Sequence, residues 1–212
     1  MELSNSDLGI ASEGSFGNHP SGFFAVADDE FLVLIDKINK LEIIARSLSL
    51  ETNFAAEKIN NLTDLKKFAD KVQFPSHKII LKDKEQNPTT IYKNIDNWNS
   101  LENAFLELLT NQPAICVETD MRAMNNPTRM KVIEQTAHKL VEKIKFACPK
   151  CATPGFEIAS IITGLPCENC NRPTRSVKMH LYKCKKCIFE QEIEIPSHKK
   201  YEDPMYCDFC NP

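Results

Sequence analysis

Residues 118–129 of the chain read Glu-Thr-Asp-Met-Arg-Ala-Met-Asn-Asn-Pro-Thr-Arg. This polar stretch follows a short apolar run, Ala114–Val117, and precedes a segment whose apolar residues recur at helical spacing. The pattern predicts a strand, a loop and a helix over residues 128–145. Asn126 is suited to the N-cap and Pro127 to the first helical position, because a cap oxygen satisfies free amides and proline has no amide to lose.

Polar residues in this loop are candidates for a ligand site. A helix N-terminus attracts anions through its free amides and its dipole, and an arginine can hold a carboxylate or phosphate with two hydrogen bonds. We therefore expect an anionic small ligand on Arg122, Asn126 and Arg129. Asp120 is the candidate general base or a ligand for a hard metal ion, and Glu13 is a second candidate catalytic group. The alternative is an Asp–Arg pair that only holds the loop in place.

The other segments of residues 1–145 indicate strands and helices in a mixed order. Residues 4–22 contain no hydrophobic period, so we expect a glycine-bearing loop there. The β-prone runs Glu30–Asp36 and Leu41–Ala45 predict a hairpin, with a helix across both as the alternative. Further elements are expected in this order: a helix capped by Thr63 and ended by Pro75, strands at His77–Leu81 and Thr89–Tyr92, and a helix that begins after Asp96 or Asn97. This order predicts an α/β fold with a mixed sheet, or an α+β fold as the alternative.

Cysteines follow the last predicted helix in four pairs with the spacing C-x-x-C. The pairs are Cys148 and Cys151, Cys167 and Cys170, Cys184 and Cys187, and Cys207 and Cys210. Two such turns complete a closed tetrahedral site, so the eight residues predict two structural zinc ions. Iron in a rubredoxin-type site would use the same ligands. We expect successive pairs to share an ion, which would give two ribbons, and interleaved or nested pairing is the alternative.

Residues 146–212 have few large apolar side chains, so a metal is needed to fold them. A structural zinc site supplies about 10–16 kcal/mol of apparent binding free energy. Strands are expected at Phe156–Ile162, Val177–Tyr182 and Ile188–Ile195. The ninth cysteine, Cys116, is expected to be a small buried hydrophobe. We therefore predict an α/β domain over 1–145 and a small, cysteine-rich, zinc-ribbon-like β domain over 146–212.

Charge and hydropathy limit the partners of the chain. The formal net charge is -3, and residues 146–212 carry 9 basic and 8 acidic side chains. Each four-thiolate zinc site would add a charge of about -2, which disfavours nucleic acid as a partner because cationic surfaces bind it. Apolar runs are far shorter than the roughly 20 residues of a membrane helix. The first residues lack the features of a secretory signal, and we expect a cytoplasmic protein.

Several motifs together resemble those of a bacterial family defined by a domain of unknown function. They are Ser-Glu-Gly-Ser-Phe-Gly at 12–17, Glu-Thr-Asp-Met-Arg at 118–122, Asn-Pro-Thr-Arg-Met at 126–130, Gly-Leu-Pro-Cys at 164–167 and the final Cys-Asn-Pro. The resemblance covers nearly the whole chain. Relatives in that family carry a further N-terminal segment with a His-Gly-Lys motif, so the resemblance implies a truncated chain that lacks part of its sheet and pocket.

Two functions remain open at this point. One is a cytoplasmic enzyme or ligand-binding protein with a pocket in the α/β domain and purely structural zinc. The other is a non-catalytic interaction module that uses the zinc ribbons to dock a protein or, against the charge, nucleic acid. Convergence of the five predicted site residues within one cleft would favour the first function.

Overall fold

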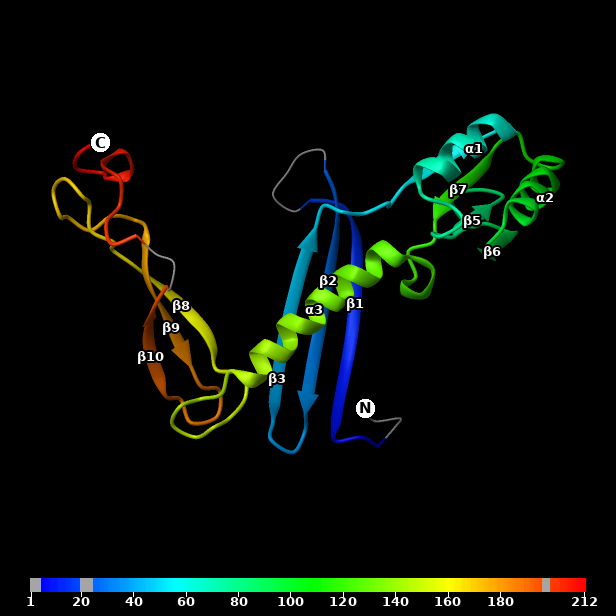
Figure 1. The fold of residues 1–212 in the computed structure, drawn as a ribbon. Coiled ribbons are helices and arrows are strands. Elements are labelled where there is room, and N and C mark those ends of the chain that lie inside the picture. Colours follow the sequence, from blue (N-terminus) through cyan, green and yellow to red (C-terminus); the bar gives the residue numbers. More distant parts are fainter. Residues whose placement is uncertain (1–4, 20–24, 196–198) are drawn as a thin grey trace. The chain divides into compact units, whose positions relative to one another are not determined.

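The computed structural model describes residues 5–19, 25–195 and 199–212 (Figure 1). Within these ranges the fold is mixed α/β, with three antiparallel sheets, three α-helices and a cysteine-rich C-terminal region. In chain order the elements are β1 (Leu8–Asn18), β2 (Val26–Asp36), β3 (Leu41–Ser49), β4 (Ala56–Ile59), α1 (Leu62–Lys71), β5 (Ile79–Lys82), β6 (Ile91–Ile95), α2 (Trp98–Leu109), β7 (Ile115–Thr119), η1 (Ala123–Asn125), α3 (Pro127–Lys145), β8 (Glu157–Thr163), β9 (Val177–Lys183), β10 (Glu190–Glu194) and η2 (Pro204–Tyr206). None of the described helices is long and apolar enough to cross a lipid bilayer.

The chain forms two compact units. The cysteine-rich unit contains Met1–Gly9, Leu34–Ile43 and Lys139–Pro212, and the α/β unit contains Ile10–Val33 and Ile44–His138. Strands β1, β2 and β3 and helix α3 each contribute residues to both units. The predicted domain boundary at residue 145 stays a prediction.

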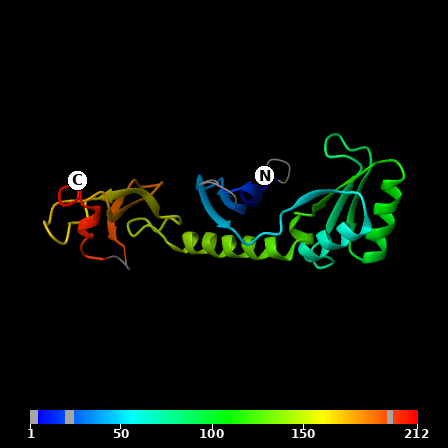
Figure 2. The ribbon, with the colours of Figure 1, turned by 90° about the horizontal axis from the view of Figure 1, so that it is seen from above.

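A four-stranded sheet with the order β4-β7-β5-β6 carries the main core of the α/β unit. Helices α1 and α2 lie beside its strands (Figure 1, Figure 2). Their apolar faces are buried in one cluster with the sheet: Leu65, Phe68 and Ala69 from α1, and Leu101, Ala104, Phe105 and Leu108 from α2, pack with Ile79, Leu81, Ile115 and Val117. The predicted helical faces are therefore core, as their spacing indicated.

Side-chain caps begin both helices. Asn97 caps α2 as expected, because its side-chain oxygen accepts a hydrogen bond from the Ser100 amide at 2.9 Å. The cap predicted at Thr63 is wrong. Asn61 caps α1 instead, with its side chain accepting from the Asp64 amide at 2.9 Å. Asn61 has the extended backbone that a cap requires, whereas Thr63 already lies inside the helix.

A three-stranded sheet has the order β1-β2-β3. Its β2-β3 hairpin confirms the hairpin predicted for Glu30–Asp36 and Leu41–Ala45. The Asp36 carboxylate closes the turn by accepting from the Asn39 amide and side chain at 2.9 and 2.7 Å. The loop predicted over residues 4–22 is wrong for Leu8–Asn18, which form β1. That segment has little apolar character of its own, so pairing with β2 determines its conformation. Residues 4 and 20–22 of the predicted loop lie outside the described residues.

Strands β8, β9 and β10 were predicted in the cysteine-rich unit, and the structure joins them in one antiparallel sheet. A small core forms beside it, in which Cys148, Phe156 and Cys184 are buried. The rings of Phe156 and Tyr182 contribute to an aromatic cluster, with centroids 5.6 Å apart. The core is small, and the structure is consistent with a need for metal ions in this region.

Candidate functional site

Eight cysteines form two groups, and in each group all four sulfur atoms lie within 4.8 Å of one another. One group contains Cys148, Cys151, Cys184 and Cys187, and the other contains Cys167, Cys170, Cys207 and Cys210. Close Sγ–Sγ distances are 3.6 and 3.7 Å in the first group and 3.6 and 3.8 Å in the second. Zn–S bonds of about 2.3 Å in a tetrahedron require roughly 3.8 Å between sulfurs. Each group could therefore hold one metal ion.

The grouping is interleaved, so the predicted pairing of successive C-x-x-C turns is wrong. Strands β8 and β9 run antiparallel, with Glu157 opposite Lys183. The turn that precedes β8 therefore lies beside the turn that follows β9, and these are the first and third cysteine pairs. The second pair follows β8 at the other end of the sheet, where it meets the fourth pair. Strand direction decides the pairing, and cysteine spacing alone does not reveal it.

The four C-x-x-C turns share one backbone geometry. In each, the carbonyl of the first cysteine accepts a hydrogen bond from the amide four residues later, from Ala152, Asn171, Ile188 and Asn211 at 2.8 to 3.0 Å. Three of those residues have a positive φ: Ala152 (56°), Asn171 (57°) and Ile188 (60°). A non-glycine residue adopts this region at a cost, most clearly a β-branched one such as Ile188. The repeated geometry points both sulfurs of each turn at one centre.

The electrostatics of the sulfurs fit a cation. A hydrogen bond with the Thr153 hydroxyl lowers the pKa of Cys151 to about 6, and the Phe209 amide lowers the pKa of Cys207 to about 7. The neighbouring Cys170 sulfur raises the pKa of Cys210 to about 12. Four crowded thiols thus oppose full ionisation of one another, and a bound metal ion would remove this conflict because it takes cysteine as thiolate.

Asp120 lies fully buried at the end of β7 and is enclosed by protein donors. Arg122 donates through Nε and Nη2 at 2.9 and 2.5 Å, and Asn125 donates through Nδ2 at 2.7 Å. Arg122 also donates to the Asn94 side-chain oxygen at 2.8 Å. Burial raises the pKa of Asp120, but these hydrogen bonds outweigh it and hold the pKa below its ordinary value. Asp120 is an ionised anchor for Arg122.

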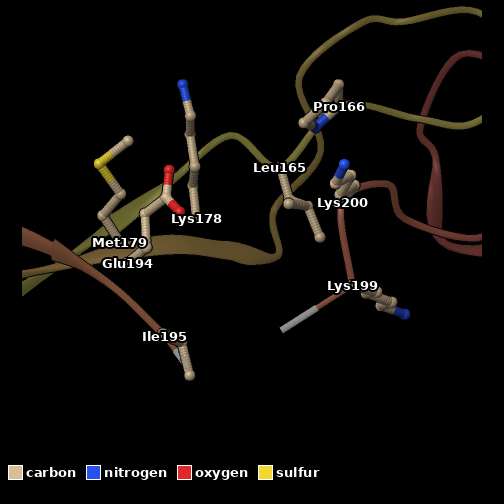
Figure 3. A pocket seen from close by; sticks show the side chains of 8 residues that line it. All are labelled: Leu165, Pro166, Lys178, Met179, Glu194, Ile195, Lys199 and Lys200. Carbon is tan, nitrogen blue, oxygen red and sulfur yellow. The ribbon is translucent and has the colours of Figure 1, made fainter. Parts of the chain in front are cut away.

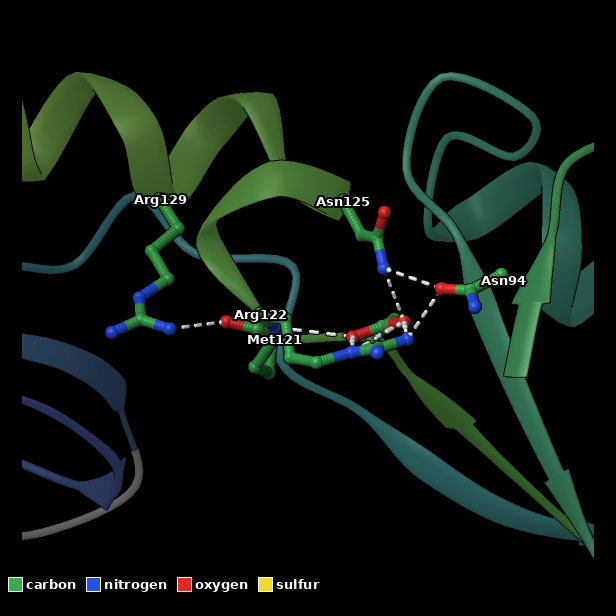
Figure 4. A network of polar contacts seen from close by, with 6 residues as sticks. Asn94, Met121, Arg122, Asn125 and Arg129 are labelled. Carbon is green, nitrogen blue, oxygen red and sulfur yellow. Dashed lines mark hydrogen bonds and ion pairs between the residues drawn. The ribbon is translucent and has the colours of Figure 1, made fainter. Parts of the chain in front are cut away.

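Arg129 points away from this cluster (Figure 4) and is paired with a different carboxylate. Its Nε donates to Glu30 Oε1 at 2.5 Å, and its Nη1 donates to the Met121 carbonyl at 2.6 Å. The Phe16 ring of β1 lies 5.0 Å from the guanidinium carbon. Gly14, two residues earlier on β1, lies against the same ion pair. Three separate segments therefore meet at Arg129.

The first amides of α3 are already bound by protein groups. Asn126 is the N-cap, as predicted, because its Oδ1 accepts from the Arg129 amide at 3.0 Å. The Thr128 amide donates to His77 Nε2 at 3.2 Å. Burial lowers the pKa of His77, which favours the neutral imidazole that accepts this bond. Few free backbone amides therefore remain at the N-terminus of α3 to bind an anion.

The predicted site residues occupy three places. Asp120 and Arg122 form one cluster, Asn126 and Arg129 lie at the start of α3, and Glu13 is exposed on β1. Side chains alternate along a strand, so Glu13 points to the face opposite Gly14. Sequence reasoning missed Glu30, Asp28 and Asn94. The available signal for Asp28 and Glu30 was their spacing: two acidic residues two positions apart in a strand point to the same face of it.

A cavity of about 360 Å³ lies in the cysteine-rich unit (Figure 3). It is lined by Leu165, Pro166, Lys178, Met179, Glu194, Ile195, Lys199 and Lys200. None of the predicted polar site residues lines it. The cavity therefore gives no support to the predicted anion site.

The whole chain matches one family model, described as a domain of unknown function (DUF6671), over residues 1–212. No curated protein matches the sequence, and no solved structure matches it. The match confirms the resemblance inferred from the motifs.

Proposed function

The chain belongs to the family of the domain of unknown function DUF6671, and we propose that its C-terminal region is a zinc-stabilised module that docks another protein. The two four-cysteine groups carry the proposal, because each supplies a complete tetrahedral ligand set. A closed four-sulfur site leaves no position for water or substrate, so the metal would stabilise the fold without entering a reaction.

Zinc is the proposed metal. Soft thiolate ligands in a tetrahedral array suit zinc and also iron, and zinc is the usual ion in four-cysteine sites of small β units. Eight of nine cysteines at metal-ligand spacing also favour a reducing, cytoplasmic compartment.

The proposed docking surface lies beside the second cysteine group. We define the aromatic surface as Tyr201, Met205, Tyr206 and Phe209, whose exposed fractions are 48, 59, 60 and 57%. Tyrosine, phenylalanine and methionine are enriched in protein interfaces. A metal-held turn would present these side chains on a rigid backbone, which reduces the ordering cost of binding.

Charge favours protein over nucleic acid as the partner. Residues 146–212 carry 9 basic and 8 acidic side chains, and two four-thiolate zinc sites would add a charge of about -4 in total. Nucleic-acid affinity depends on phosphate neutralisation by cationic surfaces. The cationic groups at the aromatic surface also have protein contacts: Arg172 lies 4.4 Å from the Phe209 ring centre, and Arg175 pairs with Asp208 at 3.0 Å.

The test begins with elemental analysis, for which we expect two zinc ions per chain. Tyr206→Ala with Phe209→Ala should retain both ions, because neither residue is a ligand, but should lose a protein partner that the wild-type chain captures. Ile158→Ala with Ile161→Ala removes two exposed apolar residues from β8 and is the matched control. Quantitative mass spectrometry of captured proteins compares the three chains. A partner held equally by all three, or none held specifically by the wild type, would contradict the docking proposal.

An anion site at residues 118–129 is the second candidate. The observation in its favour is that the Arg122 side chain is 42% exposed while its partner Asp120 is fully buried. The Arg122 side chain thus keeps solvent-exposed surface while it binds Asp120 and Asn94. The occupied amides of α3 and the pairing of Arg129 with Glu30 weigh against this candidate.

Calorimetric titration of phosphate, nucleotides and small carboxylates tests the second candidate. If Arg122 anchors an anion, Arg122→Ala should weaken binding at least tenfold, which corresponds to about 1.4 kcal/mol. The exposed Arg175→Ala is the control for loss of a surface charge. Absence of binding to the wild type, or equal binding to the Arg122 variant, would remove this function.

A further inference from the structure

Two acidic residues share the buried face of β2. Asp28 and Glu30 are two positions apart, so their side chains point to the same side of the strand, and neither has any exposed surface. Leu32 continues the same buried face. A buried carboxylate is unfavourable unless a positive charge or hydrogen-bond donors compensate it.

One cationic group compensates this pair among the described residues, and it contacts Glu30. Arg129 donates to Glu30 through Nε at 2.5 Å and Nη2 at 3.5 Å. Neither carboxyl oxygen of Asp28 has a hydrogen-bond donor among the described residues. The Glu30 carboxyl interacts with the Asp28 carboxyl as a charge and as a potential hydrogen-bond partner. Two ionised carboxylates cannot bond to each other, because each can only accept.

The neighbouring strands bring uncharged groups to this face. Strand β1 contributes Gly14 and Phe16 toward Arg129, and the buried residues of β3 end with the uncharged Ser47. Asp29 points to the opposite side of β2, where Arg46 binds it with two hydrogen bonds of 2.7 Å. The charged groups that act on Asp28 are therefore Glu30 and Arg129, with a weaker contribution from Asp29.

We propose that Asp28 and Glu30 form a buried binding site for one proton, which resides on Asp28 and donates to Glu30. The bound proton leaves one negative charge opposite the one guanidinium of Arg129 and gives the orphan Asp28 carboxyl a hydrogen bond. Release of the proton creates an uncompensated buried charge and weakens the packing of β2 with the first turns of α3. The pair is thus a pH-sensitive device in the α/β unit, independent of the metal centres.

The titration of Asp28 agrees with this geometry. Burial, followed by the charge and hydrogen bond of Glu30, raises the pKa of Asp28 from its ordinary value of 3.8 to about 7. Between these two pKa values the folded state binds more protons than the unfolded state, so stability falls as pH rises. The stabilisation from the proton is complete below about pH 4 and is lost as pH rises through about 7.

Native-state hydrogen exchange of the full, metal-loaded chain tests the proposal. After correction for intrinsic exchange, protection of the amides of β2 and of residues 130–136 should fall on the order of 100-fold between pH 5 and pH 8. Asp28→Asn replaces the acid with a neutral side chain that can still donate to Glu30, so it should remove this fall and should be better protected than wild type at pH 8. Burial also lowers the pKa of His77, but His77 is present in both chains, so the difference between them isolates Asp28.

Asp29→Asn is the matched control, because it changes the neighbouring carboxyl on the other face and should keep the pH dependence of the wild type. If amide protection in the wild type depends on pH in the same way as in Asp28→Asn, the proposal is overturned. A second measurement uses the wild type alone, so it does not depend on whether the variant folds. Carbon NMR of wild type labelled at aspartate should show one carboxyl resonance that titrates near neutral pH. If every aspartate has titrated by pH 5, Asp28 holds no proton and the proposal fails.

Discussion

Gly14 is the residue at which an N-terminal motif meets the buried ion pair of the α/β unit. A Cβ atom at this position would overlap the Glu30 carboxyl and the Arg129 guanidinium. Neither group can easily move, because Glu30 is fully buried and Arg129 also binds the Met121 carbonyl. The absence of a side chain therefore allows the close approach of β1 to this pair.

Gly14→Ala should destabilise the α/β unit by about 1–3 kcal/mol, as expected for overpacking at a closed contact. Gly17 lies three residues further along the same strand, where an added Cβ atom would meet no described atom within 4 Å. Gly17→Ala should therefore be neutral or stabilise by up to about 1 kcal/mol. Hydrogen exchange of the β2 amides compares the two variants. Equal effects would show that the Gly14 contact does not constrain the fold.

Single residues were predictable where their role is local. Asn126 and Pro127 were identified correctly because a helix cap depends on adjacent residues. Glu13 could not be placed, since its direction depends on β1, a strand that exists through pairing with β2. The partner of Arg129 is Glu30, 99 residues away along the chain, and no local pattern joins them.

At the scale of elements, the strands and turns of the cysteine-rich unit were predictable. Which turns share a cysteine group was not. Each C-x-x-C turn carries its own signal, and β8, β9 and β10 follow from β-prone runs. The four turns have the same chemistry, so spacing does not distinguish one partner from another. The antiparallel register of β8 and β9 supplies the missing information.

Pairs of cysteine substitutions test the interleaved grouping by counting ions. Cys167→Ser with Cys207→Ser removes two ligands of one group, so this variant should lose one zinc ion and keep the other. Cys148→Ser with Cys167→Ser removes one ligand from each group and should lose both. Successive pairing requires the reverse: two ions lost from the first variant and one from the second.

Cys116→Ala is the control for these substitutions. Cys116 is a buried cysteine outside both groups, and burial raises the pKa of its thiol and keeps the thiol neutral. Its replacement should retain both ions, and removal of one buried sulfur should cost about 1 kcal/mol. Elemental analysis of the three variants gives the comparison. Metal loss from Cys116→Ala would show that the counts report general unfolding.

For the whole molecule, the fold class and the eight clustered cysteines were predictable, whereas the grouping of those cysteines and the arrangement of polar residues were not. Periodicity identified α1, α2, α3 and most strands because amphipathic faces are visible in sequence. Asp120 and Arg122 were correctly placed after a strand, but they form an ion pair with each other. Asn94 accepts a hydrogen bond from Arg122, and Asn125 donates one to Asp120. Polarity in a loop does not distinguish a binding group from an internal anchor.

The interleaved cysteine groups also determine how metal uptake is coupled. Both cysteine groups depend on one folded sheet: the first joins the turn before β8 to the turn after β9, and the second joins the turns that follow β8 and β10. The ion that binds first therefore orders much of the scaffold that the second ion requires and lowers the loop-closure entropy of the second step. If both groups bind metal, we expect positively cooperative loading, with few single-ion chains at intermediate metal concentrations.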